Sequence, residues 1–333
     1  MEQLENLKMY FLKTLPTQSA FKKKNGVGSS ERYKRIKSAL EHELLLPIMC
    51  FIVFGAQSFK PFMLMFQKEE PMVHVLYPEM RKLVIEILGK FLIETKLKEL
   101  ASDVKMMIDY VDDADWKKDI RTQPNMGTKT IELLNKNVKD KLVKKWFVKM
   151  VKHFCVACAE HLLKNLLLNK QVLYDVQYLH PMLRTEKILE KPIKRLAGTI
   201  AKCLGESFHD TFEVEKSCSV EDFQDIIKTE IDFFRMETIP ESMILHEKPK
   251  DRPKTTQKTS YWEGAFMVAG VRDDKSDDDT VYRRVDNFWL DVLEMKDVVS
   301  GKQKYKHLAK LALCGLVLSH GNAEPTRKRF LHQ

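Results

Sequence analysis

The chain has 333 residues, of which 44% are hydrophobic and 31% are charged, proportions typical of a protein that folds around an apolar core. Its low content of glycine and proline, 12 of each, argues against an all-β architecture that needs many turns. The net charge of +9 permits contact with polyanions without requiring it.

Cysteine usage and hydropathy indicate an intracellular protein. The six cysteines lie mostly within apolar helical patterns and form no dense framework, so we expect them to be reduced. The N-terminus has neither a basic start nor the apolar core of a signal peptide. The most apolar run, residues 44–54, is too short to span a bilayer. These features favour the cytoplasm or the nucleus and predict no membrane association.

The first part of the chain is predicted to be helical. Apolar residues at helical spacing predict a helix over residues 3–14, and Pro16 ends it. A polar loop covers residues 17–30. Residues 31–66 predict a pair of helices, with breaks near Pro47 and Pro61.

A turn and a long amphipathic helix come next. Pro71 and Pro78 bracket the turn. The helix is predicted from Met80 to Leu100, because its apolar residues recur at intervals of three and four.

The longest predicted helix covers residues 130–168. Its predicted core stripe recurs at intervals of four residues, with one interval of three: Ile131, Leu134, Val138, Leu142, Trp146, Met150, Phe154 and Cys158. Lysines lie on a neighbouring face of this helix.

Two further helices are predicted over about residues 186–204 and 220–235. Residues 241–285 change in composition, with Pro, Lys and Thr followed by a cluster of aspartates between Asp273 and Asp279. We interpret this segment as a flexible linker or long loop. The aspartates could bind a hard cation loosely, but they lack the glycine and closing glutamate of a calcium loop, which favours a solvated acidic loop.

The lysines on the longest helix suggest one candidate binding site. Clustered lysine displaces the counterions condensed on a nucleic acid, so residues 136–152 could bind DNA without sequence preference. The candidate residues are Lys141, Lys144, Lys145, Lys149 and Lys152. A solvated face opposite the core stripe explains the same pattern, and no aromatic residues are expected to interleave with these lysines.

Cysteine and histidine residues on the same helix suggest a second possibility. Cys155, Cys158 and His161, with His153, fall within two helical turns. Zinc requires ligands that converge tetrahedrally, and the sequence offers no second ligand pair at a suitable spacing. Ordinary burial of small cysteine side chains is the alternative, and we predict no metal site.

Several short runs resemble hAT-type transposases and the host proteins derived from them. In the first hundred residues the runs are YFLKTLP (10–16), RYKRIK (32–37), FGAQSF (54–59) and EPMVHVLYP (70–78). Near the C-terminus they are DNFWL (286–290), KYKHLAKLAL (304–313) and SHGNAE (319–324). The first group is similar to the family's helical insertion domain, and the second to its C-terminal dimerisation region.

This resemblance implies a remnant without catalytic activity. The family's reaction uses three carboxylates to hold two metal ions. The third carboxylate position is occupied by Thr326, a neutral residue, and the strands that would carry the other two are expected to be missing. We therefore predict no enzyme activity, no catalytic residue, no cofactor and no small-molecule substrate. An active transposase or nuclease is the least favoured alternative.

The sequence predicts a mainly α multi-helix bundle with a C-terminal helical hairpin and without most of the ribonuclease-H-like sheet. The expected domains are an insertion-type helical domain (1–240), the linker (241–285) and a truncated dimerisation region (286–333). The favoured function is association with itself or with related hAT-derived proteins, in the nucleus rather than the cytoplasm. The expected contact residues form an apolar face that the missing sheet would leave exposed: Phe288, Trp289, Leu293, Tyr305, Leu308, Leu311 and Leu318. Sequence-independent DNA binding is the alternative.

Overall fold

The structure, a computed structural model, describes residues 2–18, 27–67, 71–112, 118–244 and 283–317. Within these ranges the chain is mainly α-helical and has no strand, only two isolated β-bridges, Leu92↔Ile120 and Lys296↔Gln303. The predicted mainly α class is confirmed.

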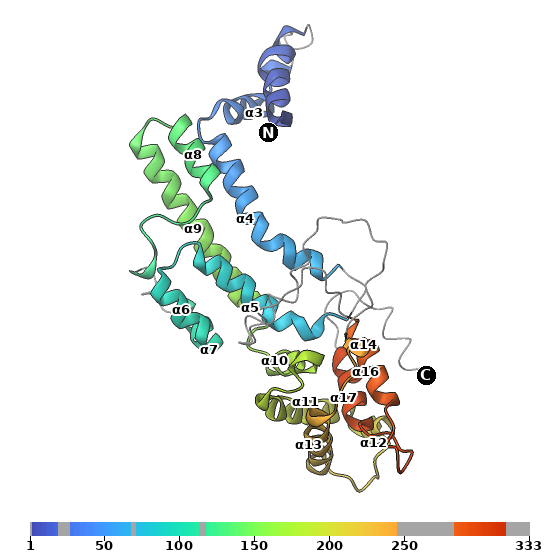
Figure 1. The fold of residues 1–333 in the computed structure, drawn as a ribbon. Helices are drawn as coiled ribbons and strands as arrows, with labels where there is room; N and C mark the ends of the chain where they lie inside the picture. Colours follow the sequence, from blue (N-terminus) through green and yellow to red (C-terminus); the bar gives the residue numbers. More distant parts are fainter. Residues whose placement is uncertain (1, 19–26, 68–70, 113–117, 245–282, 318–333) are drawn as a thin grey trace.

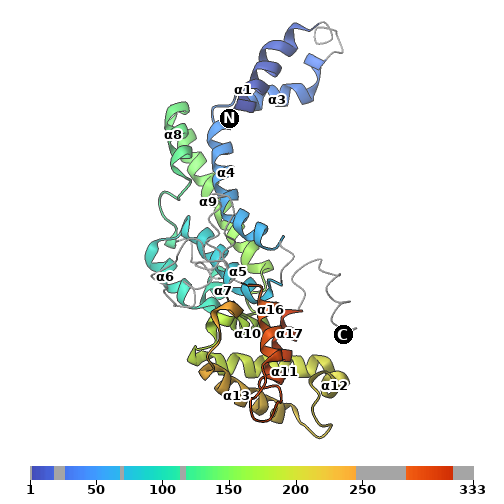
Figure 2. The ribbon, with the colours of Figure 1, turned by 45° about the vertical axis from the view of Figure 1, so that its right-hand side comes forward.

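The molecule is elongated, with its N-terminal helices at one end and its C-terminal helices at the other (Figures 1 and 2). The helices of the first half are α1 (Glu2–Lys8), α3 (Glu31–Glu41), α4 (Leu45–Met65), α5 (Val73–Gly89), α6 (Glu94–Ser102), α7 (Val104–Asp112), α8 (Thr128–Asn137) and α9 (Lys141–Asn165). A π-helical turn, Met9–Thr14, continues α1, and Pro16 lies in the short 3₁₀ turn that ends it. We call α4, α8 and α9 the arm.

The C-terminal lobe is formed by the remaining helices. They are α10 (Gln171–Val176), α11 (Glu190–Leu204), α12 (Phe208–Phe212), α13 (Val220–Met236), α14 (Glu241–Ile244), α16 (Val285–Glu294) and α17 (Lys306–Leu316). The last two form the predicted C-terminal hairpin, which packs on α11 and α13 (Figure 1). The hairpin and the helices of residues 171–236 therefore share one core, although residues 245–282 between them lie outside the described ranges.

Three of the predicted helices have wrong boundaries. The break predicted near Pro61 is absent, because α4 continues through Pro61 to Met65. The helix predicted over residues 80–100 begins earlier, at Val73, and ends at Gly89, because the backbone turns there to form the bridge at Leu92. The helix predicted over residues 130–168 is two helices. Val138 is fully buried in an extended conformation, and Asp140 then caps α9 by accepting a hydrogen bond from the Leu142 amide at 2.7 Å.

This break changes which face of α9 is buried. The predicted stripe is correct for Leu134 and Val138, but three of its later members are exposed: Leu142, Trp146 and Phe154. The stripe that is buried lies one residue after the predicted stripe and has the same interval of four. Its members are Phe147, Val151, Cys155, Ala159 and Leu163. The sequence correctly predicted the spacing of the apolar residues on α9 but not which of its apolar stripes is buried. The buried stripe is the one that faces the helices against which α9 packs, chiefly α5.

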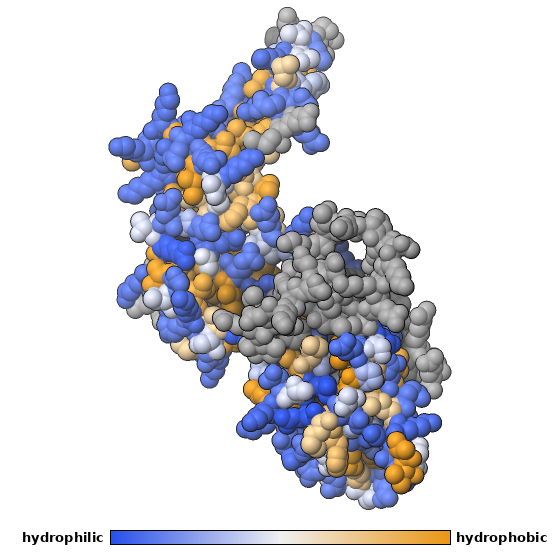
Figure 3. Space-filling view, in the orientation of Figure 1, coloured by the Kyte–Doolittle hydropathy of each residue, from blue (hydrophilic) through white to orange (hydrophobic). Residues whose placement is uncertain are grey.

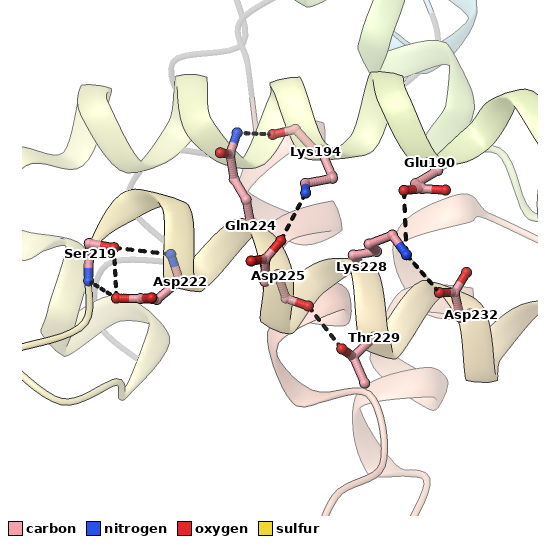
Figure 4. Close-up of polar contacts among 9 residues, drawn as sticks. All are labelled: Glu190, Lys194, Ser219, Asp222, Gln224, Asp225, Lys228, Thr229 and Asp232. Atoms are coloured by element: carbon pink, nitrogen blue, oxygen red, sulfur yellow. Dashed lines mark hydrogen bonds and ion pairs between the residues drawn. The ribbon is translucent and has the colours of Figure 1, made fainter.

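Polar contacts tie α11 to α13 in the C-terminal lobe (Figure 4). A capping box starts α13, since Ser219 and Asp222 exchange hydrogen bonds between side chain and backbone. Farther along, the Gln224 amide donates to the Lys194 carbonyl at 2.7 Å, and Lys194 forms an ion pair with Asp225 at 2.9 Å. These contacts hold the pair of helices on which the hairpin rests.

Candidate functional site

The apolar face proposed for dimerisation is buried inside the chain. Phe288, Trp289, Tyr305, Leu308 and Leu311 are all at least 95% buried, and Leu293 is half-buried against the same core. The expectation that this face is exposed is therefore wrong. It assumed that a missing sheet had covered the face, whereas α11, α13 and the turn at residues 177–179 cover it here.

Hydrogen bonds and ring contacts fix the hairpin in place. The Trp289 indole Nε1 donates to the Leu179 carbonyl at 2.8 Å, and its ring lies 5.5 Å from that of Phe234. The Tyr305 hydroxyl donates to Glu237 at 2.5 Å. Burial, and then this hydrogen bond, raise the pKa of Tyr305 well above its ordinary value. In this conformation the buried side chains of the hairpin are unavailable to a partner.

Glu230 of α13 holds the start of α17. Its carboxylate accepts hydrogen bonds from the backbone amides of His307 at 3.3 Å and Leu308 at 2.7 Å. The His307 ring lies 2.7 Å from the same carboxylate. A carboxylate at a helix N-terminus satisfies free amides and complements the helix dipole. This contact is structural, and it accounts for a charged residue inside the lobe.

The lysine face lies on α9 and comprises Lys141, Lys144, Lys145, Lys149 and Lys152. Three of these lysines are exposed: Lys141, Lys145 and Lys149. The other two, Lys144 and Lys152, are half-buried. Within the described residues, no carboxylate oxygen lies within 4.0 Å of these five ammonium groups. Lys144 instead donates to the Asn135 side chain of α8 at 3.1 Å. Figure 3 shows hydrophilic side chains projecting from this part of the arm. The structure thus brings the predicted lysines together as free positive charges on one helix.

Aromatic and apolar side chains lie beside the lysine face, contrary to the sequence expectation. Trp146 is 56% exposed and Leu142 is 75% exposed, and they alternate along the helix with Lys145 and Lys149. Phe154 is half exposed and touches Phe51 of α4 edge to face, with ring centroids 5.4 Å apart. The predicted lack of aromatic interleaving followed from assigning Trp146 and Phe154 to the core.

An open groove of about 570 Å³ lies between this helix and the start of α4. Its lining residues come from three helices and their connections: Lys34, Arg35, Ser38, Ala39, His42, Leu44, Leu45, Ile48 and Trp146. Lys34 forms an ion pair with Glu31 at 2.8 Å, whereas Arg35 has no ion pair among the described residues. The groove therefore combines an apolar floor with a basic rim.

The cysteine and histidine residues of α9 do not converge. Cys155 is buried, and burial raises the pKa of its thiol to about 11, so it is a neutral core residue. Cys158 is half-buried, and His153 and His161 are exposed. Among the described residues, no group of three or more His, Cys, Asp or Glu side chains is placed to hold a metal ion.

Other sequence predictions fall on residues outside the described ranges. They are the dimerisation residue Leu318, the motif position Thr326 and the acidic residues 273–279. The described part of the predicted linker begins as the short helix α14, whose Ile244 carbonyl accepts a hydrogen bond from the Arg283 amide at 2.8 Å.

The sequence reading missed the groove and the exposure of Trp146. A signal was present, because an aspartate two residues before Leu142 is a favoured N-cap and predicts a new helix start. A helix that restarts at residue 141 need not continue the stripe of the preceding helix. The groove itself had no signal, because Trp146 is far along the chain from its other lining residues, which all lie between Lys34 and Ile48.

Comparisons with known proteins add no family or relative. No protein-family model, no curated protein and no solved structure matches this chain.

Proposed function

We propose that this chain is a non-enzymatic DNA-binding protein that contacts the phosphate backbone through the lysine face of α9. One observation carries the proposal: exposed ammonium groups without carboxylate partners among the described residues lie on one helix, next to an exposed tryptophan. Each lysine that neutralises a phosphate releases a condensed counterion, which favours binding. Contacts of this kind fix position on the nucleic acid but carry no sequence information.

The contrast with two paired lysines of the C-terminal lobe strengthens this proposal. In the C-terminal lobe, Lys194 pairs with Asp225 at 2.9 Å, and Lys228 pairs with Glu190 at 3.7 Å and Asp232 at 3.5 Å (Figure 4). A phosphate would have to compete with these carboxylates. On α9 it would meet no such competitor among the described residues.

The test is the salt dependence of DNA affinity. Wild-type protein is titrated into a fluorescent duplex of arbitrary sequence at several salt concentrations. Lys145→Ala plus Lys149→Ala should weaken binding and reduce the slope of log affinity against log salt by about 2, since each lost phosphate contact removes about 0.9. The matched control, Lys194→Ala plus Lys228→Ala, removes the same charge from paired sites and should leave the slope nearly unchanged. No binding at low salt, or equal slopes for the two variants, would contradict the proposal.

The origin of the chain is a further part of this proposal. The runs at residues 10–16, 32–37, 54–59, 70–78 and 286–324 support descent from an hAT-type transposase, and such a descent is compatible with DNA binding in the nucleus. Association with itself or with related proteins remains a second candidate. The predicted contact face of the hairpin is buried, so self-association requires another surface.

A further inference from the structure

One face of α4 is apolar and uncovered. Five large side chains on it are more than a third exposed: Met49, Ile52, Val53, Met63 and Leu64, at 39%, 57%, 60%, 59% and 51%. Among the described residues α4 is the one helix with the length and composition to cross a membrane, and only 22% of its most apolar window is buried. Contiguous apolar surface on this scale marks an interaction site.

The exposure follows the helical period and is not a frayed end. The opposite side of α4 is buried through Phe51, Gly55, Ser58 and Met65, and it packs against α5 and α8. Residues at intervals of three and four share one side of a helix, so the exposed set lies on one side over about four turns, with Ala56 and the exposed Lys60 between its two apolar ends. Within the described ranges, α5 and α8 cover one side of α4, and the other side is open to a partner.

We propose that this stripe binds a second copy of the chain, with the two α4 helices antiparallel and crossing at Ala56. The two exposed methionines are symmetric about that residue, since Met49 and Met63 lie seven positions on either side of it. Ile52 and the exposed Lys60 lie four positions on either side, so the aliphatic stem of Lys60 would pack on Ile52 of the partner. In an antiparallel pair each methionine would meet the other methionine of the partner. A two-fold interface requires this self-complementarity.

The side chain at the crossing point is small and exposed. Ala56 allows the two helix axes to approach to the separation at which side chains interlock, about 8–10 Å. Larger residues on both sides then pack around it. Methionine suits such a seam because its flexible side chain fills irregular gaps.

Charge argues against other classes of partner. Among positions 46–64, Lys60 is the one charged residue, and its aliphatic stem can lie along an apolar surface. A nucleic acid or an acidic peptide would find little to pair with here. Lipid could not surround α4, because α5 and α8 cover its other side. This proposal does not depend on DNA binding, which uses α9.

Sedimentation equilibrium of the full chain at micromolar concentration tests the proposal. Wild-type protein should have twice the mass of one chain. Ile52→Glu plus Val53→Glu should weaken association at least thirtyfold, about the change from losing one 2 kcal/mol hot spot. The matched control is Phe233→Glu plus Met236→Glu, an exposed apolar pair on α13, which should leave the dimer intact. Thermal unfolding by circular dichroism shows that each variant is folded.

Disulfide trapping tests the geometry. Ala56→Cys places a thiol next to its symmetry mate and should give a covalent dimer under mild oxidation. Ala157→Cys, at an exposed position on α9, should give no more crosslink than wild-type protein. A monomeric wild type, a dimer that survives the Ile52 and Val53 changes, or equal crosslinking of both cysteine variants would overturn the proposal. If the wild-type protein floats with lipid vesicles and the Ile52 and Val53 changes abolish this flotation, the face binds a membrane instead.

Discussion

The packed hairpin of the C-terminal lobe and the exposed faces of the arm differ in how completely their side chains are satisfied. In the lobe, Trp289 is buried and hydrogen-bonded, and Lys304, Lys306 and Lys310 each pair with a glutamate. In the arm, the lysine face has no carboxylate partner among the described residues, and apolar side chains of α4 and α9 remain exposed.

This difference predicts which substitutions change the free energy of unfolding and which change binding to another molecule. Residues whose partners lie in the same chain contribute to the free energy of unfolding, so changes in the lobe should destabilise the protein. Residues left without partners contribute little to folding and are free to contact another molecule. Changes on the exposed faces of the arm should therefore alter binding and leave stability nearly constant.

The largest effect on stability is expected at Trp289. Trp289→Ala removes a buried ring and leaves the Leu179 carbonyl without its donor, which should lower the free energy of unfolding by about 4 kcal/mol. Urea unfolding followed by circular dichroism measures the loss. Trp146→Ala, the same change at an exposed position of the arm, serves as the control and should cost less than about 1 kcal/mol. Equal losses at the two sites would contradict the comparison.

A somewhat smaller loss is expected at a buried carboxylate. The side chain of Asp175 is 2% exposed and accepts two hydrogen bonds from Arg195, at 2.7 and 3.2 Å. Arg195→Ala should lower the free energy of unfolding by about 3 kcal/mol, because it leaves a buried charge without its partner. Lys194→Ala breaks an exposed ion pair one residue away and should cost less than about 1 kcal/mol. Similar losses for the two variants would show that Asp175 does not depend on Arg195.

Acid should destabilise the junction between α5 and the lobe. Burial lowers the pKa of His180 well below its ordinary value, and the neighbouring His74, with ring centroids 5.6 Å apart, lowers it further. Below about pH 6.5 the unfolded chain then binds more protons than the folded one, so the free energy of unfolding falls as the pH falls.

Urea titrations between about pH 7 and pH 5 measure this loss. His180→Asn removes the titrating ring and keeps an acceptor for the Met182 amide, which the imidazole Nδ1 binds at 3.2 Å. The variant should lose less stability across the same range. A variant as acid-sensitive as wild type would exclude His180 as the cause.

The smallest effect on stability is expected on the lysine face. Lys145→Ala plus Lys149→Ala removes two exposed charges without a carboxylate partner among the described residues, so the free energy of unfolding should change by less than about 0.5 kcal/mol. The same variant is the one expected to lose DNA affinity. A large change in thermal stability would mean that these lysines have a structural role, and it would weaken their assignment to binding.

Much of the local structure could be predicted from the sequence. The pair of helices in residues 31–66, the helices at 190–204 and 220–236 and the hairpin of α16 and α17 were expected within a few residues of their positions. The first three segments are periodic with polar or proline boundaries, so local spacing is sufficient for them, whereas the hairpin was expected from the resemblance at residues 286–324. The lysine spacing on α9 also correctly placed these residues on one part of the helix.

The predictions were wrong where contact with a distant segment of the chain decides whether a residue is buried. The break at Val138 has a local signal in the N-cap Asp140, but it is also stabilised by burial of an extended residue against the core, which no local pattern records. The exposure of the hairpin was inferred from a sheet that the chain was expected to lack, whereas α11 and α13 cover it. Lys34 and Arg35 join Trp146 at the groove only through tertiary packing.

The sequence by itself determined that this protein is helical, where most of its helices lie and which residues share a helix face. Only the tertiary structure decided which face of each helix is covered, so that Phe147 and Trp289 became core residues while Trp146 and Ile52 remained at the surface. Periodicity fixes the relative positions of side chains on one helix. The choice between burial and exposure depends on where the neighbouring helices pack, and that is set by contacts between residues far apart in the chain.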